Sequence, residues 1–194
     1  MNKMSVRISI FLLLGAIYMI TLNGCSGAGR FKKYSSEAPD LNITMDYISG
    51  WEGRETRGTN GSYADVYFGE PRDKAGTKAY RAFMQITSFP VMNAQTVEVF
   101  EDSLVANKLK FKDGKLLGRT KVKIPAGEAA DLGFSFKIPD RLYSVKSKFI
   151  PMRERIIVFE GGGRFYTVKY QNAEEDFDRY SKDFDHIIRS LRVK

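Results

Sequence analysis

The chain holds one histidine and one cysteine, and these two residues limit the chemistry it can perform. His186 is the only imidazole, which excludes a histidine-rich metal site. Cys25 is the only thiol, which excludes an intramolecular disulfide and any multi-cysteine zinc site. A nucleophilic triad would need His186 as its base. Because His186 falls within a segment of helical spacing, we expect a structural or surface role for it, and no metal or cofactor.

Paired carboxylates are the remaining catalytic possibility, since a glycosidase needs only two acids across a cleft. Glu52 and Glu55 follow Trp51, and Asp65 lies between two tyrosines. With 23 acidic residues in the chain, such neighbours arise by chance. No Walker loop, dinucleotide-binding glycine motif or zinc-protease motif is present. We therefore expect no enzyme and no catalytic residue, and keep an envelope glycan hydrolase as the minor alternative.

Cys25 has the clearest chemical role of any residue in the chain. Lys3 and Arg7 form a short positive region, and the apolar run that follows is short for a membrane span. The run ends in Leu22-Asn23-Gly24-Cys25, which resembles the lipobox of bacterial lipoproteins. In that motif the cysteine sulfur accepts a diacylglycerol and a small residue precedes the cleavage site. An uncleaved anchor with an incidental cysteine is the alternative.

The lipobox predicts how the chain is divided and where it resides. Residues 1–24 would be the signal peptide, 25–40 a Gly/Ser-rich flexible tether, and 41–194 the domain. Acyl chains on Cys25, palmitate among them, would hold the protein on a bacterial membrane. Ser26 follows the cysteine, and the absence of Asp there resembles the signal for the outer membrane. We therefore favour the periplasmic side of the outer membrane over the inner membrane, with an envelope protein as partner.

The charge balance adds a second candidate feature. The chain has 31 Lys and Arg against 23 Asp and Glu, a net charge of +8. Arg119, Lys121 and Lys123 alternate, so they would share one face of a strand. Such a face could dock anionic lipid, a polyanionic polymer or an acidic protein, or could be a solvated face that blunts a sheet edge. Nucleic acid fits an exported protein poorly. The full basic strip is Lys108, Lys110, Lys112, Lys115, Arg119, Lys121 and Lys123.

Aromatic residues give a third hypothesis. Trp51, Tyr63 and Tyr67 could gather at one end of the sheet as anchors for a partner. Aromatic side chains are also common in cores, and we expect the core to hold most of them.

The elements that must position these residues are mostly strands. Apolar residues alternate in most segments from Leu41 onward, and the glycines at 161–163 predict a hairpin turn. Two segments have helical spacing, one beginning near Val97 and one over the C-terminus. For the second, Asn172 and Glu175 form a candidate capping box. The class is therefore α+β, an antiparallel β-sheet with flanking helices.

This order of elements resembles the PsbP-like family, the extrinsic proteins of the photosystem II oxygen-evolving complex and their bacterial relatives. The resemblance covers about residues 41–192 and implies an α/β/α sandwich on an antiparallel sheet. It further implies a non-catalytic module for assembly, stabilisation or docking, and the cyanobacterial photosystem member is itself a lipoprotein. No functional residue of the photosystem members matches a position here. The features that carry the resemblance are Gly50-Trp51, the helix at Thr96–Asn107, the turn at Gly127–Ala130, the hairpin at Arg155–Tyr170 and the ending Phe177 to Leu191.

Overall fold

The computed structural model describes residues 29–72, 80–92, 95–140 and 147–194. The expected signal peptide, Cys25 and the first part of the tether lie outside these residues. Residues 32–194 form one compact unit. The strands of the described residues are β1 (Phe31–Ser35), β2 (Ile43–Ile48), β3 (Glu52–Arg57), β4 (Ala64–Gly69), β5 (Phe83–Pro90), β6 (Lys112–Ile124), β7 (Gly127–Pro139), β8 (Phe149–Gly161), β9 (Arg164–Ala173) and β10 (Arg192–Val193). The helices of these residues are α2 (Val97–Lys108) and α3 (Ser181–Ser190), with 3₁₀ turns η1 (Thr59–Gly61) and η2 (Glu174–Tyr180).

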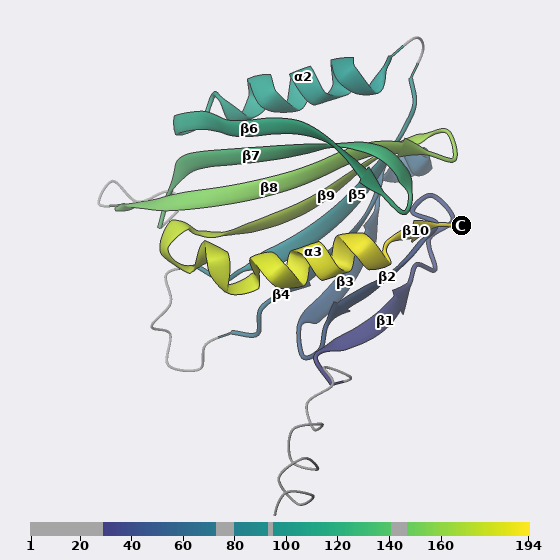
Figure 1. Ribbon diagram of the computed structural model, residues 1–194, viewed down its shortest axis with the longest axis horizontal. Coiled ribbons are helices and arrows are strands. Elements are labelled where there is room, and N and C mark those ends of the chain that lie inside the picture. Colours follow the sequence, from purple (N-terminus) through teal and green to yellow (C-terminus); the bar gives the residue numbers. More distant parts are fainter. Residues whose placement is uncertain (1–28, 73–79, 93–94, 141–146) are drawn as a thin grey trace, which may run out of the picture. The chain divides into compact units, whose positions relative to one another are not determined.

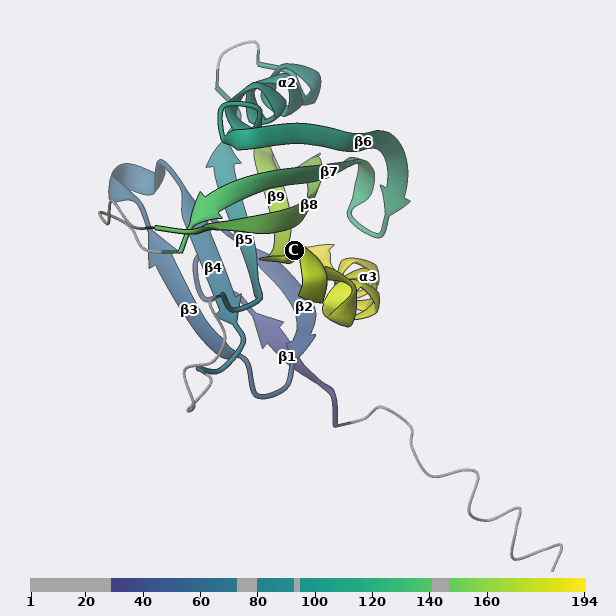
Figure 2. The ribbon, with the colours of Figure 1, turned by 90° about the vertical axis from the view of Figure 1, so that its left-hand side faces the viewer.

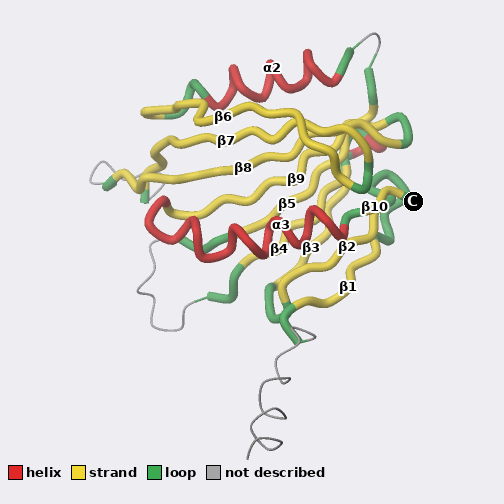
Figure 3. The backbone as a smooth tube through the Cα atoms, in the orientation of Figure 1, coloured by secondary structure: helices red, strands yellow, loops and turns green. Residues whose placement is uncertain are grey.

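The strands form two sheets, as Figure 1 shows. The larger has seven strands in the order β3-β4-β5-β9-β8-β7-β6, and its strands pair antiparallel throughout. The smaller has the order β1-β2-β10. Apart from two α-helices and the 3₁₀ turns, the regular structure of the described residues is strand, which Figure 3 makes visible. The predicted α+β class with an antiparallel sheet is confirmed.

The two helices cover opposite faces of the larger sheet (Figure 2). Helix α2 packs on a cluster that includes Leu132 and Phe134, and its Phe100 stacks on Phe165 with ring centroids 5.1 Å apart. Helix α3 follows η2 on the other face, where Phe184 lies 5.7 Å from the Tyr170 ring. The alternation of β7, β8 and β9 makes these two faces, because successive side chains of a strand point to opposite sides.

The C-terminal apolar stripe forms as predicted, but it begins differently. Six apolar residues at helical spacing make up the stripe that the sequence predicts, and all six are buried. Their first part is the 3₁₀ turn η2, and α3 begins only at Ser181. The predicted capping box is absent, because Asn172 bonds instead to the neighbouring backbone and to the Tyr170 hydroxyl. The stripe comprises Phe177, Tyr180, Phe184, Ile187, Ile188 and Leu191.

Part of the segment expected to be a flexible tether is ordered. Residues 31–35 form β1, which is an edge strand of the smaller sheet. Tyr34 packs edge-on against Phe68, with ring centroids 5.3 Å apart, and its hydroxyl donates to Glu55. Ala38 is buried as well. The Gly/Ser content of 25–40 hid this strand, because the side-chain contacts of Tyr34 come from residues more than twenty positions away.

The glycine turn is confirmed as a hairpin between β8 and β9. Gly162 and Gly163 have φ of +58° and +72°. Both values lie in the left-handed region that side chains with a Cβ disfavour, so glycine suits both turn positions. The turn sets the pairing of β8 with β9, and that pairing aligns the side chains described below.

Candidate binding surface

The carboxylates considered for catalysis do not converge. Glu55 stands opposite Val66 in the register of β3 with β4, and its carboxylate accepts from Tyr34 and from the Glu37 backbone. Asp65, next to Val66, therefore faces the other side of the sheet, where it accepts from Gln85 at 3.2 Å. Glu52 is exposed at the start of β3. Among the described residues, no three His, Cys, Asp or Glu gather in a way that could hold a metal ion.

His186 has a structural partner, in agreement with its expected role. Its Nε2 lies 2.9 Å from Asp46 Oδ2, and Lys33 Nζ lies 3.2 Å from the other Asp46 oxygen. Burial alone would raise the pKa of Asp46, but the hydrogen bonds from His186 and Lys33 outweigh burial and lower that pKa. These contacts join β2 to α3.

The predicted aromatic group is divided between different parts of the molecule. Trp51 is 7% exposed and packs edge-on against Tyr180, so it is a core residue. Tyr67 stacks on Phe83 with ring centroids 5.2 Å apart. Tyr63 is half-buried next to η1. The core interpretation holds for Trp51, and the three side chains do not form one patch.

The basic strip begins at the end of α2 and continues along β6, and ion pairs engage two of its residues. Lys108 Nζ lies 2.6 Å from Glu154 Oε1, and that carboxylate is fully buried. Arg119 contacts Glu101 at 2.7 Å and Asp102 at 2.6 Å, both on α2. Those two carboxylates raise the pKa of Arg119, so it stays charged. The exposed remainder is Lys110, Lys112, Lys115, Lys121 and Lys123.

Strand β6 forms one edge of the larger sheet, and no strand of the described residues pairs with its outer side. Its first half is irregular, with register shifts before Lys115 and before Gly118. From Gly118 to Ile124 the pairing with β7 is continuous. Over this regular stretch the predicted alternation is confirmed, since Arg119 and Lys121 stand opposite Leu132 and Ala130, residues of the core under α2.

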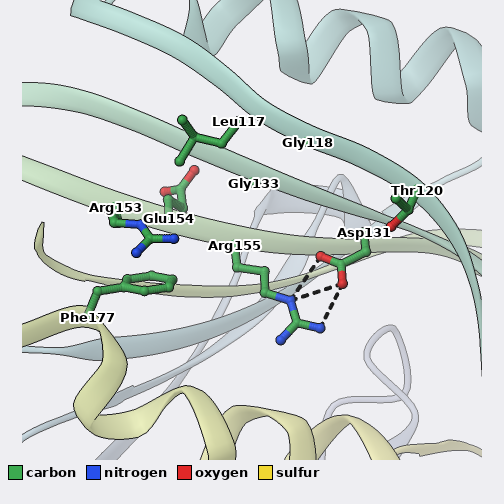
Figure 4. Close-up of a pocket in the computed structure, with 9 residues that line it drawn as sticks. All are labelled: Leu117, Gly118, Thr120, Asp131, Gly133, Arg153, Glu154, Arg155 and Phe177. Atoms are coloured by element: carbon green, nitrogen blue, oxygen red, sulfur yellow. Dashed lines mark hydrogen bonds and ion pairs between the residues drawn. The ribbon is translucent and has the colours of Figure 1, made fainter.

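A pocket of about 240 Å³ lies beside this edge, on the face of the sheet that α3 also covers. Figure 4 shows its lining. Gly118 and Gly133 are register partners in its floor. Neither glycine has a positive φ, and a Cβ at either would meet nothing closer than 3.7 Å. The backbone therefore does not require these glycines, and their effect is to leave the floor hollow. The lining comprises Leu117, Gly118, Thr120, Asp131, Gly133, Arg153, Glu154, Arg155 and Phe177.

Two arginines project from β8 into this pocket, and they differ in how firmly they are held. Arg155 Nη2 donates to Asp131 at 2.7 Å, and its Nη1 donates to Asp185 at 2.6 Å. Burial would lower the pKa of Arg155, but these carboxylates outweigh burial and raise it. Arg153 lies over the Phe177 ring at 4.6 Å, and its closest carboxylate oxygen, on Asp178, is 3.9 Å away. Arg153 is therefore the pocket cation that a ligand can engage.

Sequence reasoning did not single out this pocket. The alternation of Arg153 and Arg155 around Glu154 is visible in the sequence and indicates two basic side chains on one face. Glu154 points away from them to Lys108 on the α2 side. The two arginines lie in the same pocket as Gly118 because of the register of β6, β7 and β8. No sequence pattern predicts that register.

The fold belongs to a known structural class, the PsbP-like α+β sandwich. The chain superposes on cyanobacterial PsbP (CyanoP) from Synechocystis sp. PCC 6803 with a TM-score of 0.56, at 14% identity over 90% of this chain and 99% of that one. It also matches PA94 of Pseudomonas aeruginosa, described as a protein of unknown function and putative regulator, at TM-score 0.50 and 12% identity over 83% of this chain and 95% of that one.

A third match is a protein of Bacteroides thetaiotaomicron, with a TM-score of 0.53 and 15% identity over 85% of this chain and 49% of that one. No model of a known protein family matches the sequence. No curated protein matches it significantly. At these identities the likeness establishes the fold, and the PsbP-like fold expected from the sequence is confirmed.

No helix in the described part of the chain is long and apolar enough to cross a membrane.

Proposed function

We propose that this chain is a lipid-anchored bacterial envelope protein whose domain docks a partner and performs no catalysis. The anchor is argued from the Leu22-Asn23-Gly24-Cys25 motif after an apolar run of signal-peptide length. The outer membrane is favoured by Ser26. The absence of catalysis is supported by the separation of Glu55 from Asp65 and by the structural partner of His186.

The observation that carries the docking function is the free, regular edge of β6 from Gly118 to Ile124, next to the hollow pocket. Seven residues of unpaired edge are enough for a partner strand to add to the sheet. Lys121 and Lys123 lie on one face of this edge and are exposed. On the opposite face, Leu117 and the Phe177 ring border the pocket.

These two faces define the chemistry of the partner segment. An added strand would alternate, with acidic side chains opposite Lys121 and Lys123, and apolar side chains directed toward Leu117. An acidic side chain on the pocket face could also reach Arg153. The same lysines would repel each other if two copies of β6 paired, so they disfavour self-association and favour a different, acidic chain.

The docking proposal is tested by placing a photo-crosslinking amino acid at Lys121 in living cells, followed by mass spectrometry of the products. The matched control places it at Arg57, an exposed residue of β3, the opposite edge strand. We expect a discrete product from position 121 that is lost in a Lys123→Glu background. Equal products from both edges, or none from position 121, would contradict the proposal.

The anchor is tested separately by feeding cells a clickable fatty acid and comparing wild type with Cys25→Ala. We expect label on the wild-type protein and none on the variant. A second comparison separates inner and outer membranes on a density gradient. Equal labelling of both proteins would contradict lipidation at Cys25 and leave the edge proposal intact.

A further inference from the structure

Exposed large apolar side chains of the described residues cluster in two segments of the chain. They belong to the stretch 91–117 or to Phe149, so they surround α2 and the first half of β6. Leu117 and Phe149 are on the face that α3 covers, but at the edge or end of the sheet and away from the helix. Three belong to the end of α2, the start of β6 and the start of β8, and these three places lie at one end of the sheet in Figure 1. These three are Leu109, Phe111 and Phe149, which are 48%, 44% and 44% exposed.

Lysines are interleaved with these apolar residues. The sequence runs Leu109-Lys110-Phe111-Lys112, and Lys148 precedes Phe149. Lys112 Nζ lies 3.8 Å from the centroid of the Phe149 ring, so the two segments are in contact. We call the six residues Leu109 to Lys112, Lys148 and Phe149 the tip.

Two acidic groups near the tip have partners, and two others line adjoining cavities. Asp113 pairs with Lys137 at 2.8 Å, and Asp140 accepts from the backbone N–H of Lys148 at 2.9 Å. Glu174 lines one cavity together with Lys115, and Glu174 and Glu175 line another together with Ile150 and Pro151. The tip itself carries three lysines and no carboxylate.

The apolar side chains of the tip point to both sides of the sheet. Phe111 lies 5.0 Å from Phe136, which belongs to the core under α2. Lys137 follows Phe136 in β7, so its side chain points to the opposite face of the sheet, and so does that of its register partner Lys112. The Phe149 ring lies under Lys112 and is therefore on this opposite face as well. A rigid partner surface would cover one face and leave the other exposed. A lipid interface is fluid and surrounds the tip, so it covers both.

We propose that the tip inserts Leu109, Phe111 and Phe149 into the surface of an anionic bilayer, with Lys110, Lys112 and Lys148 at the headgroups. Leucine and phenylalanine bury apolar area at the interface, and each adjacent lysine is attracted to anionic lipid. Lysine stems also extend along apolar surface while the ammonium stays in water. This contact requires neither lipid on Cys25 nor a partner on β6.

The test uses residues 26–194, which contain the whole compact unit and lack the acceptor cysteine. Partition is measured by flotation with phosphatidylcholine vesicles, with and without phosphatidylglycerol. We expect binding that requires phosphatidylglycerol and weakens with salt. Lys110→Glu with Lys112→Glu should lower the partition coefficient about tenfold or more. Leu109→Ser with Phe149→Ser should lower it several-fold.

Two matched variants serve as controls. Met92→Ser with Val99→Ser removes exposed apolar residues from the same side of the molecule but outside the tip. Lys121→Glu with Lys123→Glu removes the same charge from the β6 edge. Both should bind within about twofold of wild type. An equal loss from the edge variant would overturn the proposal in favour of a general charge effect.

A second measurement reports insertion directly. The chain has a single tryptophan, Trp51, which is buried and gives a constant background. In Phe149→Trp, the added emission should shift to shorter wavelength with anionic vesicles and be quenched by brominated lipid. An unshifted emission, or capture of polyglutamate by the tip without any vesicle binding, would overturn the proposal and point to an acidic protein.

Discussion

The two helices of the chain lie on opposite faces of one sheet and bury their side chains to different extents. In α3, Phe184 and Ile187 are almost fully buried, and polar links such as Asp46 with His186 tie the helix to β2. In α2, the apolar residues Phe100 and Leu104 are only half-buried, and the one buried residue is Glu101. The same periodicity therefore gives a closed face in one helix and a partly open face in the other.

This difference assigns separate roles to the two sides. The α3 side contributes stability, since its apolar stripe is removed from water. The surface around α2 and the start of β6 keeps exposed apolar and basic residues that a stable fold does not need. Exposed apolar area of this kind marks interaction surfaces. If the two helices differ in this way, truncating a core residue of α3 costs more stability than the matched truncation in α2.

The largest expected effect is a matched pair of truncations, one in each helix. Phe184→Ala should lower the free energy of unfolding by about 3–5 kcal/mol, because the side chain is fully buried. Phe100→Ala should cost about half as much, since its ring is half-exposed. Denaturant unfolding monitored by circular dichroism measures both. Equal losses would remove the distinction between the two faces.

The buried ion pair between α2 and the sheet should give the next largest effect. Lys108→Met leaves the Glu154 carboxylate buried without its partner and should cost up to about 3 kcal/mol. Lys169 lies close enough to offset part of this loss. Lys108→Met with Glu154→Gln should recover most of the stability. If the double variant is as unstable as the single one, the loss comes from the packing of the Lys108 side chain and not from the unpaired Glu154 carboxylate.

The contact between α3 and β2 should affect how the melting temperature declines at acidic pH. Because the folded pKa of Asp46 is lowered, its contribution is present above the unfolded value of about 3.9. It is lost as the pH falls through the folded value. Asp46→Asn should therefore flatten the decline of the melting temperature below about pH 4. Asp178→Asn, at an exposed position, should reproduce the wild-type curve.

The smallest effect is expected where α2 meets β6. Arg119 spans Glu101 and Asp102 with separate nitrogens of its guanidinium. Arg119→Lys keeps the charge but cannot reproduce that fork, and should cost about 0.5–1 kcal/mol. The difference should shrink at high salt. A loss that does not change with salt would mean that shape, and not charge, holds α2 at this edge.

Local patterns predicted those parts of the fold that are amphipathic. The stripe from Phe177 to Leu191 and the alternation in β7 and β8 each place apolar residues on one side, so periodicity identified them. Strand β3 was missed because it is an exposed edge strand without apolar alternation. Strand β1 was missed because residues far along the chain, such as Phe68, supply its contacts.

The candidate surface could be predicted only in part. The sharing of one face by Arg119, Lys121 and Lys123 follows from a period of two, and the register confirms it. The pairing of Arg119 with α2 depends on how helix and strand pack, which charge counting does not reveal. The pocket depends on Gly118 meeting Gly133, and the register shift at Leu116 sets that pairing. Sequence alone gives neither.

The early start of β1 has a consequence for binding strength. If Cys25 is held in a bilayer, residues 26–30 are the only chain between the lipid and Phe31, the first residue of β1. Five residues span at most about 18 Å. A tether of that length keeps the domain at a local concentration in the millimolar range relative to the membrane that holds the lipid. Contacts too weak to survive dilution in a test tube would then be occupied most of the time in the cell.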